Sequence, residues 1–502
     1  MALFIGIDLG SSSVKCAAVD ERGEIRAQAE RSYDFDSPRD GWLEINPEAW
    51  WQLTRMVLAE TVAKIDTREI RGIGLCGVMM MAVMLDSDGR PVRPTLSWLD
   101  QRVLPQLNRI KGSELEQALF EATGTAISPS QTILPLLWVK ENEPENFRRI
   151  AKVMLSKDYV RFRLTGNIHT DLTDASGTLL LDNRIGRWNG DIAAKLGLDS
   201  RILPELVSST EQTGYVIAEV AAEIGLPPDL RVPLVAGAGD GVSAALGLGI
   251  VKPGQLGITV GTAGVLMSAA PAFVADDKRR CILFEHPVPG LWYLVTATNT
   301  SGEAVRWFSH TVYKNLPEAE RYARYIADAS EAPAGSHGLI FLPYLAGSRS
   351  PHYDATVRGS FLGLDLQCSL SDMARSVMEG VAYELRDCFD VHREVLKTQG
   401  MEIDDIRISG GIVRNPLWLQ ILADVLDAPL RVPRATELGA LGAAMNAAVG
   451  VGFYSNHQEA AAHMLATGRK IAPDPTSLAV YSEGYQRFRA GYEALSEIRR
   501  LP

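Results

Sequence analysis

The sequence predicts an α/β protein composed of two similar halves. Apolar, strand-like runs alternate with segments of helical periodicity along most of the chain, and this alternation is typical of α/β folds. A strand followed by a glycine-hydroxyl turn also occurs twice, at Gly10-Ser11 and at Gly261-Thr262, about 250 residues apart in a chain of 502. A duplication of this size accounts for the full length of the chain.

The first half opens with a strand, a turn and a second strand. Residues 3–9 are largely apolar, Gly10-Ser11-Ser12-Ser13 form the turn, and residues 14–20 resume an extended pattern. The elements that follow are assigned from helical periodicity and from short apolar runs. They are helices over residues 47–64, 113–122 and 132–141 and strands over residues 70–75 and 82–86.

The second half is predicted to begin after a glycine-rich stretch, residues 246–253, where a helical segment ends. We therefore assign one domain to residues 1–247 and a second to residues 248–502. Two unrelated hairpins remain an alternative to a duplication at this stage. The elements predicted here are strands over residues 256–260, 280–285, 291–295, 338–342 and 404–411 and helices over residues 372–397, 416–426 and 437–449.

The charge of the chain argues against polyanionic partners. Lys and Arg number 50 and Asp and Glu 61, which gives a formal net charge of −11. No overall basic field exists to hold nucleic acid or an anionic membrane surface, so both are excluded as predicted partners. A polyanionic ligand would have to be held by local features of a binding site.

Cysteine usage and the N-terminal segment predict a reduced, cytoplasmic protein. The five cysteines include no C-x-x-C pair, so neither a zinc site nor a disulfide framework is indicated. The first residues have no basic region and reach Asp8 too early for a signal peptide. The longest apolar run, residues 72–85, is shorter than the roughly 20 residues that span a bilayer.

The first turn has the composition of a phosphate-binding loop. Successive backbone N–H groups and hydroxyls in the turn Gly10-Ser11-Ser12-Ser13 can form an anion-binding nest. Asp8, just before the turn, can hold a hydrated Mg²⁺ that neutralises the phosphates. An ordinary surface hairpin, which glycine and serine also favour, is the alternative interpretation.

A candidate catalytic carboxylate follows a later strand. Asp240 lies in Gly237-Ala238-Gly239-Asp240-Gly241, directly before a helical segment. A helix N-terminus stabilises the anionic form of such a carboxylate and keeps it available as a base. Asp is also a common N-cap residue, and the two interpretations are compatible.

The last glycine motif predicts contact with a nucleotide. Ser409-Gly410-Gly411, with Arg414 and Asn415 after it, joins a strand to a helix. Paired glycines let a flat ring or a ribose approach the backbone, and the helix N-terminus favours phosphate. A tight strand-to-helix turn is the structural alternative.

Other familiar motifs are absent or fail on inspection. The chain has neither a Walker A sequence nor G-x-S-x-G. Residues 72–77 fit G-x-G-x-x-G, but a helix precedes them and a methionine run follows, so they do not predict a dinucleotide site. The run Met79-Met80-Met81 is most simply core filler, with substrate contact through Met79 and Met80 as the functional alternative.

Together these residues resemble the FGGY family of carbohydrate kinases, and its xylulokinase-like members most. The resemblance covers nearly the whole chain and follows one order of motifs. They are IGIDLGSSSVK, GWLEINPEAWW, SKDYVRFRLTG, TDLTDASGTLLLD, GAGDG, TVGTAG, FLPYLAGSRSPHYDATVRGSFLGL, ISGGIVRNPLWLQILAD and LGALGAA. The fold of this family is similar to that of the actin and hexokinase (ribonuclease H-like) ATPases, with two duplicated α/β lobes and a central cleft.

The resemblance implies ATP-dependent phosphorylation of a sugar hydroxyl, with Mg²⁺, in an enzyme that forms a homodimer. It implies that Asp240 is the base and that Asp8 and Asp240 organise the metal. The residues implied to hold phosphates and nucleotide are Gly10, Ser11, Ser12, Ser13, Lys15, Gly261, Thr262, Gly302, Gly410, Gly411 and Asn415. The residues implied to contact the sugar are Met79, Met80, Trp98, Asp100 and Asp240.

The departures from the family pattern concern the sugar. Xylulokinases usually carry Gln-Met-His-Gly where this chain has Val78-Met79-Met80-Met81, and Asn where it has Gly241. Side chains that would hydrogen-bond sugar hydroxyls, and so discriminate strongly between sugars, are thereby missing. A ketopentose such as D-xylulose is the first expectation, and another pentulose, a polyol or a sugar acid is the alternative. A catalytically weak ATP-binding regulator is a third hypothesis, against which the intact Asp8 and Asp240 argue.

Overall fold

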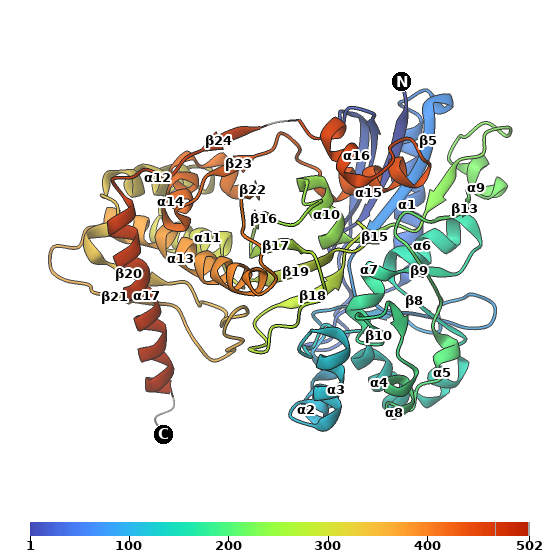
Figure 1. Ribbon diagram of the computed structural model, residues 1–502, viewed down its shortest axis with the longest axis horizontal. Helices are drawn as coiled ribbons and strands as arrows, with labels where there is room; N and C mark the ends of the chain where they lie inside the picture. The colour runs from blue at the N-terminus through green and yellow to red at the C-terminus, as the bar shows by residue number, and fades with distance from the viewer. Residues whose placement is uncertain (467, 500–502) are drawn as a thin grey trace. The chain divides into compact units, whose positions relative to one another are not determined.

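The computed structural model describes residues 1–466 and 468–499 and divides into two compact units. Unit 1 contains residues 1–252, 269–293 and 437–466. Unit 2 contains residues 253–268, 294–436 and the described residues from 468 onward. The chain therefore returns to unit 1 twice after first leaving it, and the units are not two contiguous halves. In Figure 1 the late helix α15 (Leu438–Gly450) accordingly lies beside the blue N-terminal strands.

Unit 1 is built on a mixed sheet of order β13-β14-β5-β1-β2-β3, with β15 also paired to β5. Strand β1 is antiparallel to β2 and parallel to β5, and the Asp8 position pairs with Cys76 on β5. The predicted strand, turn and strand at the N-terminus are thus confirmed. The strands are β1 (Leu3–Leu9), β2 (Ser13–Asp20), β3 (Ile25–Ser32), β5 (Ile70–Gly77), β13 (Gln212–Tyr215), β14 (Pro233–Val235) and β15 (Ala238–Gly239).

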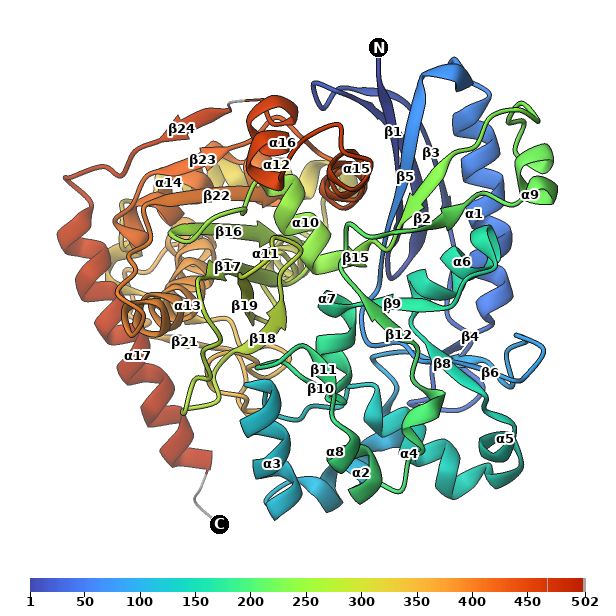
Figure 2. The same ribbon diagram turned by 45° about the vertical axis from the view of Figure 1, so that its right-hand side comes forward.

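Strand β1 packs against a helix on each face of the sheet. Ile5 and Ile7 belong to the core beneath α1 (Pro47–Val62). Gly6 on the opposite face lies against α15, where an added Cβ would stand 1.9 Å from the carbonyl oxygen of Ala440. Only a residue without a side chain lets the helix approach this closely. Figure 2 shows α1 and α15 on the two sides of the strands.

The second large sheet has the order β18-β19-β17-β16-β22-β23-β24. Within unit 2, β16 is antiparallel to β17 and parallel to β22, as β1 is to β2 and β5 in unit 1. This shared pattern confirms the duplication. The strands are β16 (Gln255–Val260), β17 (Gly264–Ala270), β18 (Ile282–Glu285), β19 (Trp292–Ala297), β22 (Asp405–Gly410), β23 (Leu430–Val432) and β24 (Arg469–Ile471).

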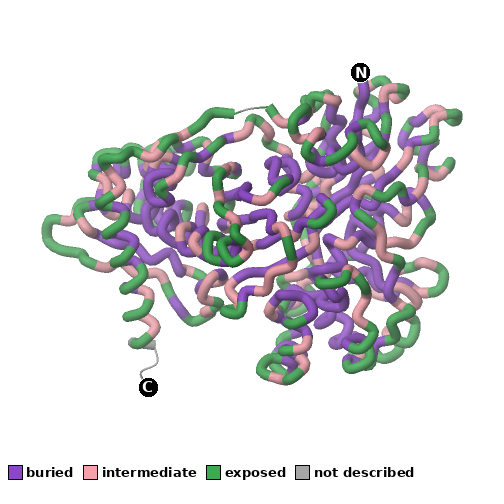
Figure 3. The backbone as a smooth tube through the Cα atoms, in the orientation of Figure 1, coloured by how far each residue is buried: buried purple, intermediate pink, exposed green. Residues whose placement is uncertain are grey.

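Helices and short strand pairs complete the units, and Figure 3 shows that the central strands are largely buried. The helices of unit 1, besides α1 and α15, are α2 (Leu104–Ile110), α3 (Glu114–Thr123), α4 (Ile133–Asn142), α5 (Pro144–Arg149), α6 (Ser156–Thr165), α7 (Leu172–Ala175), α8 (Gly190–Lys195), α9 (Ala218–Glu223), α10 (Asp240–Leu248) and α16 (His457–Met464). Those of unit 2 are α11 (Gly302–Val312), α12 (Glu318–Glu331), α13 (Leu370–Lys397), α14 (Pro416–Leu426) and α17 (Leu478–Arg499). The short pairs are β4 (Glu44–Ile45) with β7 (Thr95–Leu96), β6 (Val83–Leu85) with β8 (Lys152–Met154), β9 (His169–Asp171) with β12 (Glu205–Val207), β10 (Leu181–Asp182) with β11 (Arg187–Trp188), and β20 (Ile340–Leu342) with β21 (Ser360–Leu362).

Three features of the described residues bear on function. The five cysteines are free thiols. Among the helices in residues 1–466 and 468–499, none is long and apolar enough to cross a membrane. The G-x-G-x-x-G sequence at residues 72–77 lies within β5, which leads into a turn and not into a helix, so the prediction that it is no dinucleotide motif is confirmed.

Candidate active site

The turn between β1 and β2 is a tight, exposed loop at the end of the unit 1 sheet. The backbone N–H of Gly10 donates to the carbonyl of Ser13 at 3.0 Å. Tyr33 holds the loop from the side, since its N–H donates to the carbonyl of Ser12 and its hydroxyl to that of Gly10. Ser11 and Ser12 are exposed to solvent. The hydroxyls of Ser11 and Ser12 are therefore presented on a fixed backbone, whereas Ser13, at the start of β2, is buried.

Asp8 lies at the end of β1, directly against the start of α15. A Cβ on Gly439 would stand 2.3 Å from the carboxylate oxygen Oδ2 of Asp8, so the absence of a side chain there makes room for the carboxylate. The other oxygen, Oδ1, is buried and has no hydrogen-bond partner among the residues that the structure describes. Burial raises the pKa of Asp8, against the opposing effects of the neighbouring Cys76 thiol and of the Lys15 charge.

Lys15, which the sequence predicts to bind phosphate, is engaged with two carboxylates. Its ammonium lies 2.9 Å from Glu437 and 3.7 Å from Glu30. Partial burial acts to lower the pKa of Lys15, but the hydrogen bond and charge of Glu437 outweigh it and raise that pKa. The role of Lys15 toward phosphate stays a prediction.

Asp240 is the first residue of α10, as the sequence predicts for a carboxylate at a helix start. The backbone N–H of Gly241 donates to its Oδ1 at 2.7 Å. The pKa of Asp240 is raised to about 7, chiefly by burial and also by the negative charge of Asp8. The backbone N–H groups at the helix start favour the anion, as the sequence predicts, but desolvation and the charge of Asp8 have a larger effect in the opposite direction.

The turn at Met79 and Met80, here called the methionine turn, packs directly against the segment that carries Asp240. Met79 is buried, and a Cβ on Gly239 would stand 2.5 Å from its Cγ. Met80 has a φ of 67°, a left-handed conformation that side-chain-bearing residues rarely adopt and that often marks functional sites. Met81 is part of the unit 1 core. The run therefore divides into a core residue, Met81, a residue packed against the segment of the candidate base, Met79, and a turn residue with a left-handed φ, Met80.

The other two predicted sugar contacts have structural partners. Trp98 is partly buried and packs against the unit 1 core. Asp100 is buried, with its carboxylate accepting from the backbone N–H of Leu43 at 2.7 Å and from the guanidinium of Arg102 at 2.9 Å. The structure does not bring Asp100 to the methionine turn through any hydrogen bond, and its sugar contact stays a prediction, as does that of Trp98.

Unit 2 contains a cavity of about 420 Å³ beside the β16–β17 turn. This volume is typical of small-ligand sites. The backbone N–H of Gly302 donates to the carbonyl of Gly261 at 2.9 Å, and an added Cβ on Gly302 would stand 2.3 Å from that oxygen. The lining residues are Val260, Gly261, Thr262, Gly302, Glu303, Val305, Arg306, Ser309, His310, Tyr322, Gly411, Ile412, Arg414 and Trp418. The structure thus brings together Gly261, Thr262, Gly302 and Gly411 as the sequence predicts.

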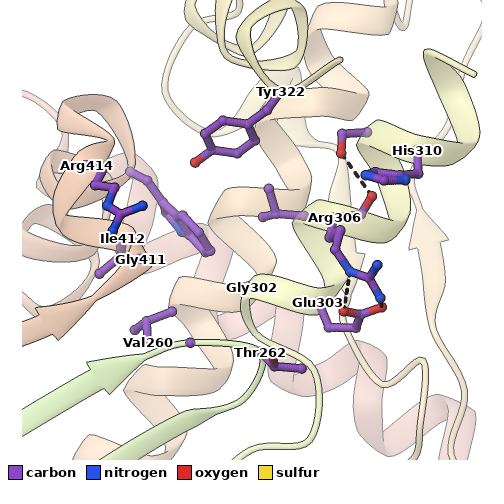
Figure 4. Close-up of a pocket in the computed structure, with 14 residues that line it drawn as sticks. Val260, Thr262, Gly302, Glu303, Arg306, His310, Tyr322, Gly411, Ile412 and Arg414 are labelled. Carbon is purple, nitrogen blue, oxygen red and sulfur yellow. Dashed lines mark hydrogen bonds and ion pairs between the residues drawn. The ribbon is translucent and has the colours of Figure 1, made fainter. Parts of the chain in front are cut away.

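Sequence reasoning missed the long side chains around this cavity. Arg306 and His310 lie one turn apart on α11, and Tyr322 on α12 directs its ring toward the Arg414 side of the cavity (Figure 4). The guanidinium nitrogens Nε and Nη2 of Arg306 each donate to the carboxylate of Glu303 at 2.7 Å. The spacing of Gly302, Arg306 and His310 by four residues on an amphipathic helix could have indicated a shared face. No local signal identifies Tyr322, because it comes from a separate helix.

Two residues predicted to bind the nucleotide, Asn415 and Gly410, support the cavity but are not among the described residues that line it. Asn415 is fully buried, caps α14 by accepting from the N–H of Trp418 at 3.1 Å, and donates to the Tyr322 hydroxyl at 3.4 Å. Gly410 has a φ of 89°, and a Cβ there would stand 2.3 Å from the carbonyl oxygen of Val260. Both therefore fix the backbone that carries Gly411.

The residues present fit a loosely held Mg²⁺. In residues 1–466 and 468–499, no group of three or more His, Cys, Asp or Glu side chains could hold a metal ion by itself. Asp8 offers a buried carboxylate oxygen without a hydrogen-bond partner among these residues. Mg²⁺ is usually bound through one or two carboxylates together with water and substrate phosphates, which this donor set allows.

Models of one protein family cover most of the sequence. The N-terminal domain of the FGGY family of carbohydrate kinases matches residues 3–247, and its C-terminal domain matches residues 256–451. The chain belongs to the FGGY family of carbohydrate kinases. It is therefore a kinase that transfers a phosphoryl group from ATP to a carbohydrate, and the function class expected from the resemblance is confirmed.

Individual FGGY kinases resemble the chain over its whole length. The xylulose kinase of Lactococcus lactis subsp. lactis (strain IL1403) is 34% identical over 501 residues, which cover 99% of this chain and 98% of that protein. A crystal structure described as a xyloylose kinase from Brucella ovis is 33% identical with a TM-score of 0.91, and 99% and 100% of the two chains are covered. The gluconate kinase of Lactobacillus acidophilus is 25% identical with a TM-score of 0.91, covering 98% of each chain. These likenesses confirm the two-lobed α/β ATPase fold.

Proposed function

We propose that this FGGY kinase phosphorylates a hydroxyl group of a ketopentose, D-xylulose, with Asp240 as the general base. The observation that carries the proposal is the position of Asp240 at the first turn of α10, partly buried beside Met79 and the Met80 turn. The choice of sugar is supported by relatives named xylulose kinase, at 34% and 33% identity over nearly the full length.

The chemistry requires one proton transfer and one phosphoryl transfer. Asp240 accepts the proton of the sugar hydroxyl while the hydroxyl oxygen attacks the γ-phosphorus of ATP. The attack is in line with the oxygen that bridges the β- and γ-phosphates, which leaves with ADP. The new bond joins the sugar oxygen to phosphorus, the bond to ADP breaks, and the proton remains on the carboxyl group. A base whose pKa is about 7 is substantially ionised at neutral pH and can still accept a proton, which suits this role.

The two glycine-hydroxyl turns are proposed to hold the phosphates. Phosphoryl transfer depends mainly on positioning and on neutralising charge, so backbone N–H groups and hydroxyls suffice where no basic field exists. The turn residues Gly10 to Ser13, with Lys15, would serve in unit 1, and Gly261 with Thr262 in unit 2. The nucleoside would occupy the unit 2 cavity, against Gly302 and Gly411.

Mg²⁺ is proposed as the counter-ion of the phosphates, with Asp8 and Asp240 as the carboxylates that hold it. When bound, this ion would neutralise the negative charge that develops during transfer. A cytoplasmic location and a homodimer also stay predictions of the sequence.

A different sugar is the second candidate, and the methionine turn favours it. Met79 and Met80 offer no side-chain hydrogen bond, and Gly241 has no side chain at all. Sites that lack polar partners discriminate weakly among hydroxyl patterns. The structural likeness to a gluconate kinase, at a TM-score of 0.91, extends this candidate to sugar acids.

An ADP-release assay over a substrate panel tests these proposals. Mg-ATP and the full chain are combined with D-xylulose, L-xylulose, D-ribulose, aldoses, polyols and D-gluconate. Turnover that is highest with D-xylulose supports the first proposal, and a clear preference for another compound selects the second. Tight ATP binding without sugar-dependent ADP release from any compound would contradict both and favour a regulatory ATP-binding role.

A further inference from the structure

A fully buried charge cluster lies behind the segment that carries Asp240. The ammonium of Lys157 on α6 lies 2.8 Å from Asp158, 2.7 Å from Asp171 and 3.3 Å from Asp174, and all four side chains have no exposed surface. Burial acts to lower the pKa of Lys157, but the three carboxylates outweigh it and raise that pKa, so the ammonium stays charged.

A buried charge cluster of this kind is weak evidence for a stabilising role. Taking several charges out of water costs more than their mutual attraction commonly returns, and apolar replacements of similar volume are often as stable. Arg161 adds a second buried cation, 3.1 Å from Asp158, and donates to the carbonyl of Ala236 at 2.8 Å. The cluster therefore reaches the backbone four residues before Asp240.

One branch of the cluster ends on the residue next to Asp240. The Asp171 oxygen Oδ2 accepts from the Thr173 hydroxyl at 2.5 Å and from the Ser209 hydroxyl at 2.8 Å, while Lys157 pairs with Oδ1. The Thr173 hydroxyl oxygen in turn accepts from the backbone N–H of Gly239 at 3.1 Å. Because the Thr173 proton is committed to Asp171, its oxygen lone pairs are directed to Gly239.

A second branch reaches the methionine turn. Asp174 Oδ1 lies 3.4 Å from the backbone N–H of Met80, the residue with the left-handed φ. The Thr132 hydroxyl donates to the Met80 carbonyl at 2.8 Å, and the Ser156 hydroxyl to the Val78 carbonyl at 2.7 Å. The two branches of the buried cluster thus end on the backbone N–H groups of Gly239 and Met80.

We propose that Thr173, oriented by the ion pair of Lys157 and Asp171, is a positioning residue that holds the Gly239 backbone and thereby sets the carboxylate of Asp240. This inference rests on the proposed role of Asp240 as the base. Thr173 does not touch the reacting atoms. Its effect is geometric, since a displacement of about 1 Å at a reacting group can cost on the order of 100-fold in rate.

Two substitutions at one position separate the hydroxyl from the bulk of the side chain. Thr173→Val keeps the shape and removes the hydroxyl, and Thr173→Ser keeps the hydroxyl and removes a methyl group. We expect Thr173→Val to lower kcat by on the order of tenfold, with the KM for ATP within about twofold of the parent value, and Thr173→Ser to retain most of kcat. The readout is steady-state ADP release with the preferred sugar of the panel.

Thr54→Val is the matched control. Thr54 is also fully buried in unit 1, and its hydroxyl donates to the carbonyl of Trp50 at 2.7 Å on α1. We expect this variant to lose stability comparable to Thr173→Val while keeping kcat. If Thr173→Val does not fold, Ser209→Ala removes another hydrogen bond to the same Asp171 oxygen and should lower kcat in the same way, by a smaller factor.

Amide hydrogen exchange provides a readout that does not depend on turnover. Thr173→Val should speed exchange in the peptide spanning residues 236–242, whereas Thr173→Ser and Thr54→Val should not. Unchanged kcat and exchange in Thr173→Val, or equal losses of kcat in the Val and Ser variants, would overturn the inference. If the unsubstituted enzyme phosphorylates no sugar, the proposed function fails, and the exchange measurement still decides whether Thr173 holds Gly239.

Discussion

At the scale of single residues, two carboxylates of unit 1 carry the proposed chemistry through their surroundings. Asp240 is partly buried, receives the N–H of Gly241, and has a pKa raised to about 7 by burial and by the charge of Asp8. Asp8 in turn lies against Gly439, with one oxygen buried. Neither environment follows from the residue type, since an ordinary Asp is ionised well below neutral pH.

Replacing Asp240 by Asn tests its role as the base. The amide keeps the size of the side chain but cannot accept the hydroxyl proton. We expect kcat to fall by on the order of 10²–10⁴, the usual contribution of a general base, while ATP affinity measured by calorimetry changes little. Asp191→Asn, at an exposed carboxylate on α8, is the control. Turnover close to that of the parent enzyme would remove Asp240 from this role.

Replacing Asp8 by Asn tests the proposed magnesium site. The substitution removes the charge and keeps the shape against Gly439. We expect the magnesium concentration for half-maximal activity to rise on the order of 10–100-fold, with sugar affinity nearly unchanged. A magnesium titration of ADP release measures the shift. An unaltered titration curve would mean that Asp8 does not hold the ion.

At the scale of elements, the contact of β1 with α15 depends on glycine. Gly6 and Gly74 lie on neighbouring strands, and added Cβ atoms would stand 1.9 Å and 2.0 Å from carbonyl oxygens of Ala440 and Ala443. Rigid backbone, not a flexible side chain, occupies the space. The late return of the chain to unit 1 is therefore built on close backbone approach.

Gly6→Ala tests this packing. Because the clash is with backbone, we expect the free energy of unfolding to fall by about 3 kcal/mol or more, above the common cost of overpacking. Gly190→Ala is the control, since a Cβ there meets nothing within 4 Å and its φ is not left-handed. Urea denaturation followed by fluorescence measures both. A Gly6→Ala protein as stable as the control would show that α15 can shift without cost.

At the scale of the whole molecule, buried neutral histidines limit stability in acid. Burial lowers the pKa of His392 and of His286 to about 3 and that of His457 to about 4. In the unfolded chain each of these imidazoles takes up a proton below about pH 6.5, while in the folded chain it stays neutral until the pH is much lower. Stability is therefore unaffected by these groups above that pH and falls as pH drops through the interval from 6.5 toward 3.

Each such histidine contributes a slope of about 1.4 kcal/mol per pH unit in this interval. His392 lies between hydroxyls, with Nδ1 2.7 Å from Ser268 and Nε2 3.0 Å from Thr296. We expect His392→Gln to reduce the pH slope of the unfolding free energy between pH 6 and 4.5 by about this amount. Urea denaturation at several pH values measures it, with His463→Gln at an exposed position as the control. An identical slope in the His392 variant would contradict the assignment.

Local patterns in the sequence determined the hairpins, the duplication, the placement of Asp240 at a helix start and the glycines beside the unit 2 cavity. They did so because turns, strands and helix ends depend on neighbouring residues. Tertiary structure alone decided the pKa of Asp240, the partners of Asp100 and Lys15, and the cavity wall formed by Tyr322. It also decided the link from Lys157 to Gly239, because Lys157, Asp171 and Gly239 lie far apart in sequence and meet only when separate elements pack. Burial and charge proximity are properties of that packing, which no local pattern contains.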